Sequence, residues 1–121
     1  MSRPATVAKL NDQLRARVGR PVFLGANEPK LGTILMTRGV MELEPEHIID
    51  VWMKVRSFDS FTEDNDPYGE HDFGSVTLGT GEKIFWKIDY YADEACEYGS
   101  EDPSDPNQSF RVLTIMLAEE Y

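Results

Sequence analysis

Features that define several common enzyme and membrane-protein classes are missing from this 121-residue chain. Its one cysteine, Cys96, permits neither an internal disulfide nor a cysteine-based zinc site, and we expect it to be an unreactive thiol. No apolar run approaches the ~18 residues of a membrane span, and no charged-then-apolar leader is present, so we expect a cytoplasmic protein. The sequence has no Gly-rich phosphate loop, dinucleotide fingerprint, nucleophile elbow or HExxH motif, which argues against ATP-, NAD- and serine-dependent chemistry.

Positive charge is scarce beyond the first forty residues. The chain carries 12 Lys and Arg against 22 Asp and Glu, which gives a net charge of −10 at pH 7. Residues 1–40 hold seven bases and two acids, whereas residues 41–121 hold five bases and twenty acids. A surface of negative sign repels nucleic acids and anionic lipids and attracts basic protein surfaces. Direct nucleic-acid binding and membrane association are therefore disfavoured, and a basic protein partner is favoured.

Two segments have the apolar spacing of helices. After a flexible N-terminus at residues 1–4, apolar residues recur every three or four positions from Ala5 to Val18, and Gly19 supplies a helix stop. A second helix is predicted over Pro45–Phe58, because proline is favoured at the first helical position and the following apolar residues form one stripe.

Segments rich in β-branched and aromatic residues predict the strands of a sheet. They are Thr33–Thr37, Phe73–Leu78, Lys83–Tyr91 and Phe110–Ala118, with a short extended piece at Val22–Leu24. The spacing of apolar residues in the second strand predicts a bulge near Gly74, and residues 79–81 predict a tight hairpin turn. Residues 110–118 favour a strand, with a helix as the alternative. The prediction is an α+β fold: one domain over residues 5–121, with a largely antiparallel sheet of about four strands and two helices.

Three blocks resemble a known family: FTEDNDPYGEHDFG at residues 61–74, FWKIDYY at 85–91 and RVLTIMLAEEY at 111–121. They are similar to a bacterial family called domain of unknown function 3768, and the resemblance covers roughly residues 5–121. That family has no established activity, cofactor or catalytic residue, so the resemblance implies none. Its occurrence in alphaproteobacterial genomes and plasmids implies an accessory role, such as defence evasion or plasmid maintenance.

The loop at residues 64–75 holds carboxylates of the kind that bind hard cations. Asp64, Asp66 and Gly69 match the first, third and sixth positions of an EF-hand calcium loop, but the later ligands are missing, which disfavours an EF-hand. A looser Mg²⁺ or Mn²⁺ site is an alternative, with Asp66, Glu70, Asp72 and Asp89 as its candidate ligands. We prefer the interpretation that these residues hydrogen-bond backbone amides in turns beside Pro67. No cofactor is therefore predicted.

His71, between Glu70 and Asp72, is the candidate general base, because histidine titrates near neutral pH and a carboxylate can orient it. Neighbours in an extended segment point to opposite faces, so a useful partner has to come from the facing strand, where Lys87 and Asp89 are candidates. A metal-dependent hydrolase or nuclease could use His71, Asp72 and Asp89. The acidic surroundings would repel a polyanionic substrate, and we prefer a structural role for His71.

The two acidic loops are the strongest functional feature of the sequence. The first acidic loop (residues 59–72) leads into the predicted hairpin and the second acidic loop (residues 92–109) leaves it, so both are expected at one end of the sheet. The predicted acidic face, with two tyrosines as aromatic anchors, consists of Asp64, Asp66, Tyr68, Glu70, Asp72, Asp93, Glu94, Glu97, Tyr98, Glu101, Asp102 and Asp105.

These loops predict a non-enzymatic protein that binds a basic protein partner. In a sharper form of the hypothesis, the protein mimics nucleic acid and inhibits a host defence enzyme, as antirestriction and anti-CRISPR proteins do. Two alternatives stay open: the metal-dependent hydrolase, and a housekeeping or assembly module that acts through an apolar patch or as a homodimer. Acidic loops that serve only solubility are the simplest competing explanation.

Overall fold

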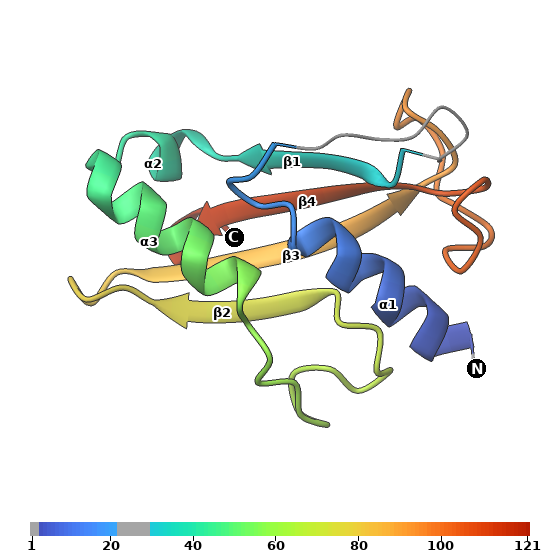
Figure 1. Cartoon of the computed structure of the whole chain (residues 1–121), viewed down its shortest axis with the longest axis horizontal. Helices are drawn as coiled ribbons and strands as arrows, with labels where there is room; N and C mark the ends of the chain where they lie inside the picture. Colours follow the sequence, from blue (N-terminus) through green and yellow to red (C-terminus); the bar gives the residue numbers. More distant parts are fainter. Residues whose placement is uncertain (1–2, 22–29) are drawn as a thin grey trace.

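A four-stranded sheet forms the centre of the computed structural model, which describes residues 3–21 and 30–121 (Figure 1). Its strands, in the order β1-β4-β3-β2, are β1 (Gly32–Met36), β4 (Phe110–Leu117), β3 (Lys83–Tyr91) and β2 (Phe73–Thr77). The β2–β3 and β3–β4 pairs are antiparallel, and β1 runs parallel to β4. The predicted α+β class and the strand at residues 110–118 are confirmed. The extended piece predicted at Val22–Leu24 lies outside the described residues.

Helices α1 (Arg3–Arg15) and α3 (Pro45–Arg56) pack against one face of the sheet (Figure 1). Helix α3 begins at the predicted proline. Of the predicted N-terminal segment 1–4, residues 1–2 lie outside the described residues, and α1 begins at Arg3. The chain leaves α1 through a turn in which Gly19 adopts a φ of +71°, a left-handed conformation that glycine accepts readily.

Two short elements were not predicted from the sequence. A four-residue helix, α2 (Arg38–Met41), follows β1, and a 3₁₀ turn, η1 (Ala118–Glu120), follows β4. Neither is long enough to show an apolar period. Across residues 3–21 and 30–121, no helix combines the length and apolar composition needed to cross a membrane.

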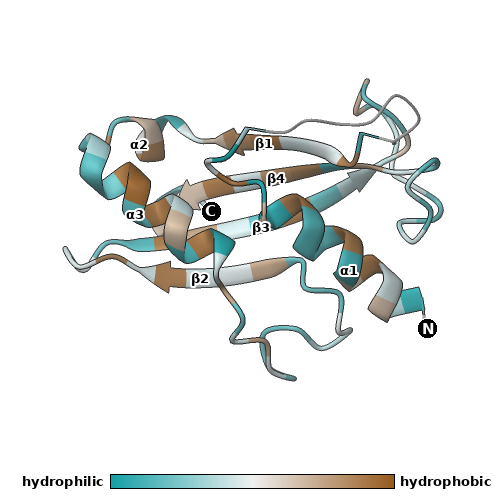
Figure 2. Ribbon diagram, viewed as in Figure 1, coloured by the Kyte–Doolittle hydropathy of each residue, from teal (hydrophilic) through white to brown (hydrophobic). Residues whose placement is uncertain are grey.

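The core lies between the helices and the inner face of the sheet. Strand β3 alternates between the two faces of the sheet, and Ile84, Trp86 and Ile88 are buried against the helices. Their neighbours Leu113 and Ile115 on β4 face the same way and are fully buried. Figure 2 shows hydrophobic residues along α1, α3 and the strands, and hydrophilic residues in the loops. This alternation places the odd-numbered residues of β3 on the opposite face of the sheet.

Strand β2 is regular, so the predicted bulge near Gly74 is wrong. Every residue from Phe73 to Thr77 pairs in continuous register with β3. Phe73 lies on the face of the sheet away from the helices, where its ring centroid is 5.5 Å from that of Phe85. Gly74 faces the helices under the indole of Trp86, and a Cβ atom there would lie 2.3 Å from the indole Nε1. The apolar side chains of β2 therefore occupy both faces, and no bulge is needed.

Two arginines join α1 to α3. Arg15 is buried, and its Nη1 atom donates hydrogen bonds to the backbone oxygens of Val55 (2.9 Å) and Phe58 (2.8 Å), where α3 ends. In return, Arg56 donates from Nη1 to the backbone oxygen of Val18 (2.8 Å), beyond the end of α1. Each arginine therefore donates to backbone carbonyl groups at or just beyond the end of the other helix. These contacts fix the side of α1 that faces the first acidic loop.

Candidate functional site

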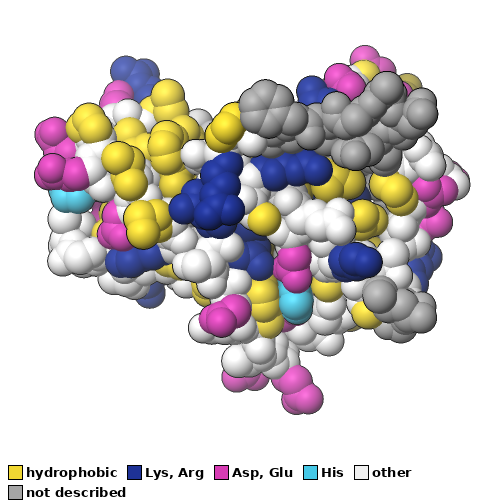
Figure 3. All heavy atoms as spheres, viewed as in Figure 1, with side chains coloured by type: hydrophobic (Ala, Val, Ile, Leu, Met, Phe, Trp, Pro, Cys, Tyr) yellow, Lys and Arg dark blue, Asp and Glu magenta, His cyan; other side chains and the backbone are white. Residues whose placement is uncertain are grey.

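Helix α1 contacts both acidic loops. Because β2 and β3 are antiparallel, the first loop, which precedes β2, and the second, which follows β3, approach the same end of the sheet. In the second loop, the guanidinium of Arg3 donates to the backbone oxygen of Glu101 (2.9 Å) and lies 3.5 Å from the carboxylate of Asp102. In the first loop, Asn11 donates to the backbone oxygen of Glu70 (3.0 Å). Figure 3 shows many of the Asp and Glu side chains near the edges of the face seen in Figure 1, and a group of Lys and Arg side chains near its centre.

The predicted binding residues divide into exposed and withdrawn groups. The exposed group is Asp64, Tyr68, Asp93, Glu94, Glu97, Tyr98 and Glu101. The withdrawn group, buried or half-buried, is Asp66, Glu70, Asp72, Asp102 and Asp105. Within the second loop, Asp102 and Asp105 accept hydrogen bonds from nearby backbone N–H groups and so shape its turns. A partner would therefore meet the exposed group, while Asp102 and Asp105 maintain the shape of the second loop.

Asp66 closes the turn of the first acidic loop. Its carboxylate accepts hydrogen bonds from the backbone N–H groups of Glu70 (3.0 Å) and His71 (3.2 Å), and the residue is almost fully buried. This is the turn function that we preferred for the Asp residues of this loop, because a short carboxylate side chain can replace a backbone acceptor. Asp66 is consequently directed into the loop and away from solvent.

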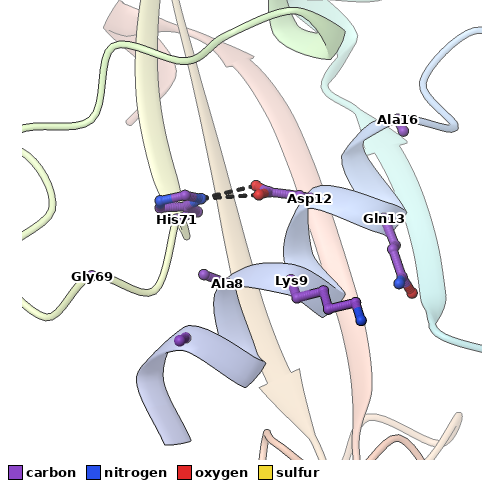
Figure 4. Close-up of a pocket in the computed structure, with 8 residues that line it drawn as sticks. Ala8, Lys9, Asp12, Gln13, Ala16, Gly69 and His71 are labelled. Carbon is purple, nitrogen blue, oxygen red and sulfur yellow. Dashed lines mark hydrogen bonds and ion pairs between the residues drawn. The ribbon is translucent and has the colours of Figure 1, made fainter. Parts of the chain in front are cut away.

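His71 meets a partner that the sequence did not reveal. Figure 4 shows Asp12 of α1 and His71 of the first acidic loop pointing toward one another, and the His71 Nδ1 atom lies 3.0 Å from Asp12 Oδ1. The imidazole stacks on the ring of Phe61, with centroids 3.9 Å apart and planes 2° from parallel. His71 has a φ of +57°, which is uncommon for a residue with a side chain. The loop therefore holds His71 against α1 at a conformational cost.

Both ring nitrogens of His71 face carboxylates of the chain itself. Nδ1 lies at Asp12, and Nε2 lies 3.8 Å from the Asp66 carboxylate. Next to this pair, a hollow of about 700 Å³ runs along α1 and is lined by small residues such as Ala8 and Ala16 (Figure 4). Nε2 is too far from Asp66 for a hydrogen bond, so the contact between Nδ1 and Asp12 is the one that ties the first acidic loop to α1.

The candidate metal ligand Asp66 lies beside His71, but the partners predicted on the facing strand do not. Lys87 and Asp89 are odd-numbered residues of β3, on the face of the sheet away from the helices, and their side chains pair with each other at 3.0 Å. The Glu70 carboxylate accepts a hydrogen bond from the phenol of Tyr90 (3.2 Å). Burial, and then the neighbouring Glu70, raises the pKa of the Asp72 carboxyl group. Among the described residues, no three His, Cys, Asp or Glu side chains form a cluster that could hold a metal ion.

A buried arginine organises the other side of α1. Arg111 is fully buried on β4, and it donates from Nε to Asn11 Oδ1 (2.5 Å) and from Nη1 to Ser109 Oγ (2.9 Å). Asn11 in turn donates to the Tyr90 hydroxyl at 2.8 Å. Burial lowers the pKa of Arg111 and raises that of Tyr90. The network links α1, β3, β4 and Glu70 of the first acidic loop, and sequence reasoning missed it because its members are far apart in the chain.

Comparison with known proteins gives one match. The family described as "Protein of unknown function (DUF3768)" matches residues 36–120, from the end of β1 to the end of η1. No curated protein matches the chain, and no solved structure does. The match covers well over half of the sequence and includes both acidic loops, β2, β3 and β4. The chain therefore belongs to the DUF3768 family of proteins of unknown function.

Proposed function

We propose that this protein is a cytoplasmic, non-enzymatic protein that binds a basic protein partner through its two acidic loops. The observation that carries the proposal is that each loop exposes a tyrosine among carboxylates. Tyr68 is 79% exposed and Tyr98 is 76% exposed. Among the described residues, the exposed loop carboxylates Asp59, Glu63, Asp64, Asp93, Glu94 and Glu97 have no base within ion-pair distance.

Exposed tyrosine surrounded by unneutralised carboxylates suits a basic partner. A tyrosine ring offers a large contact area at low entropic cost, and tyrosine is enriched among the residues that dominate binding energy. The carboxylates create a field that accelerates association with a positively charged surface and weakens as salt is added. In the sharper form of the proposal, the partner is a nucleic-acid-binding enzyme of host defence, whose basic groove accepts carboxylates in place of phosphates.

The test compares two variants that lose the same charge at different places. The loop variant carries Asp64→Asn, Glu94→Gln and Glu97→Gln, and the control variant carries Glu44→Gln, Glu46→Gln and Glu119→Gln, all at exposed positions. A partner captured from lysate by the wild-type chain is purified, and its Kd is measured with each variant by calorimetry. Exposed charge pairs contribute about 0.2–1 kcal/mol each, so the loop variant should bind roughly tenfold more weakly and the control variant about as well as wild type. Equal weakening in both variants would contradict the proposal.

A second candidate function, an assembly module that forms a homodimer, is supported by an apolar patch on the opposite end of the helical face. Its exposed members are Met41, Ile49 and Met53, each more than half exposed, beside an apolar hollow of about 350 Å³. The patch adjoins β1, an uncharged strand at the edge of the sheet, which is the kind of edge that a second copy can extend. Light scattering of wild type and Met41→Glu tests this: a dimer that becomes a monomer supports the candidate, and a monomeric wild type eliminates it.

A further inference from the structure

Three bases surround a hollow where α1 ends beside β1. The hollow has a volume of about 300 Å³, and its basic residues are Arg17, Arg20 and Lys30. Leu14 and Ile34 supply an apolar part of the lining, and Thr33 adds a hydroxyl group. Figure 3 shows Lys and Arg side chains gathered at the centre of this face of the molecule. We call this feature the basic hollow.

The basic hollow is unusual because the chain has nearly two acids for each base. Several bases elsewhere, namely Arg3, Arg38, Lys54 and Lys87, each lie within 4.0 Å of a carboxylate, whereas the exposed Lys9 and Lys83 form no ion pair with a described residue. No carboxylate is found among the described residues that line the basic hollow, and none of its three bases forms an ion pair with a described residue. Placing three cations around one cavity costs free energy through repulsion, and a bound anion removes that cost.

The end of a helix accounts for only part of this arrangement. Arg17 and Arg20 follow α1, where positive charge complements the helix dipole. Lys30 comes from a different segment, immediately before β1, so the dipole does not explain its presence. Its ammonium group lies 5.8 Å from the ring centroid of Phe110, a cation–π distance that restricts where the side chain extends. Bases from two separate segments therefore line one cavity.

We propose that the basic hollow binds a small molecule through a phosphate monoester group. Two guanidinium groups and one ammonium group offer many donors and no acceptor, which suits the terminal oxygens of a phosphate. A phosphate monoester carries a charge close to −2 at neutral pH and so offsets most of three positive charges, whereas a carboxylate offsets only one. The volume is at the lower end of the range for ligand pockets, and the apolar lining suits an organic group attached to the phosphate.

A long polyanion fits this site less well than a small phosphate. The chain as a whole carries a charge of −10, and both acidic loops would repel a nucleic-acid strand that extended beyond the cavity. The basic hollow involves neither acidic loop, so the phosphate site and the proposed protein-binding function stand or fall independently.

The test measures phosphate binding against matched probes and variants. Inorganic phosphate and glucose 6-phosphate are added to the full chain, with sodium chloride at equal ionic strength and unmodified glucose as the controls. Calorimetry and thermal unfolding are recorded for wild type, for Arg17→Gln/Lys30→Gln and for the control Lys9→Gln/Lys83→Gln. The control loses the same charge, and Lys9 and Lys83 are exposed residues outside the basic hollow. We expect saturable binding of glucose 6-phosphate to wild type and to the control, and at least ~tenfold weaker binding to Arg17→Gln/Lys30→Gln, because each lost charge-assisted hydrogen bond costs about a factor of ten or more.

Several results would overturn the proposal. One is a wild type that responds to phosphate no more than to chloride, and another is equal phosphate binding by Arg17→Gln/Lys30→Gln when circular dichroism shows that this variant is folded. If a short single-stranded oligonucleotide bound more strongly than glucose 6-phosphate, the ligand of the basic hollow would be nucleic acid and not a small molecule. Glu28 lies outside the described residues, so Glu28→Gln is tested as well. Phosphate binding that occurs only in Glu28→Gln would show that the chain supplies its own anion.

Discussion

Replacing Asn11 by alanine tests the buried network that joins α1 to the sheet. Asn11 is fully buried, and its amide makes three hydrogen bonds: it accepts from Arg111 Nε and donates to the Tyr90 hydroxyl and to the Glu70 backbone oxygen. Among the described residues, Arg111 has no carboxylate within ion-pair distance, so its charge depends on neutral acceptors such as Asn11. Asn11→Ala removes one of those acceptors and deprives two partly buried groups, the Tyr90 hydroxyl and the Glu70 backbone oxygen, of a hydrogen-bond donor.

The magnitude follows from the groups left without partners. A hydrogen bond to a charged group contributes about 1.5–3 kcal/mol, and each of the two neutral bonds contributes about 1 kcal/mol. We therefore expect Asn11→Ala to lower the free energy of unfolding by about 3–5 kcal/mol. For a domain of this size, that corresponds to a Tm lower by roughly 10–20 °C.

The assay is urea unfolding followed by circular dichroism, together with a thermal scan. Gln13→Ala, at an exposed position of the same helix, is the matched control and should change stability by less than about 0.5 kcal/mol. Asn11→Asp keeps an acceptor for Arg111 and should be less destabilising than Asn11→Ala. A loss below about 1 kcal/mol for Asn11→Ala, or equal losses for the two Asn11 variants, would refute the reasoning.

Three further predictions concern the core and the first acidic loop, each checked by Tm. Gly74→Ala should cost about 1–3 kcal/mol, because its Cβ would lie 2.3 Å from the indole of buried Trp86. Burial, and then the neighbouring carboxylates, raise the pKa of Asp72 in the folded protein. The ionised carboxylate therefore lowers the stability of the fold above pH 3.8, the ordinary pKa of this group. Asp72→Asn should consequently raise Tm at pH 7, and this gain should vanish near pH 3. Asp12→Asn should cost about 1–2 kcal/mol, because buried Arg15 loses its carboxylate partner at 3.0 Å.

Local periodicity was sufficient to predict most of the fold. The alternation of residues from Lys83 to Tyr91 gave β3 its bounds and placed Ile84, Trp86 and Ile88 on one face, because a strand has a side-chain period of two; the structure shows that this face is buried. Pro45 gave the start of α3 for an equally local reason. The prediction of a bulge near Gly74 was wrong because it placed Phe73 on the same face as the other apolar residues of β2. An aromatic residue on the outer face of a sheet cannot be told from one on the inner face by sequence alone.

The contacts of the candidate site could not be predicted in this way. His71 and Asp12 are separated by 59 residues, and nothing in either segment indicates that α1 docks against the first acidic loop. The sequence did indicate that Asp66 belongs to a turn, because Asp beside proline usually does. It did not indicate which acidic residues are withdrawn from solvent, because that depends on which backbone N–H groups the folded loops leave without partners.

The docking of α1 has a consequence for the minimal unit that can fold. The family match begins at residue 36, yet α1 supplies Leu14 to the core, Arg15 to the end of α3 and Asn11 to the network around Arg111. A fragment of residues 36–121 would also lack nearly all of β1. It should be unstable when expressed alone and regain structure when a peptide of residues 1–35 is added, as in a split protein whose halves reassemble without a covalent link.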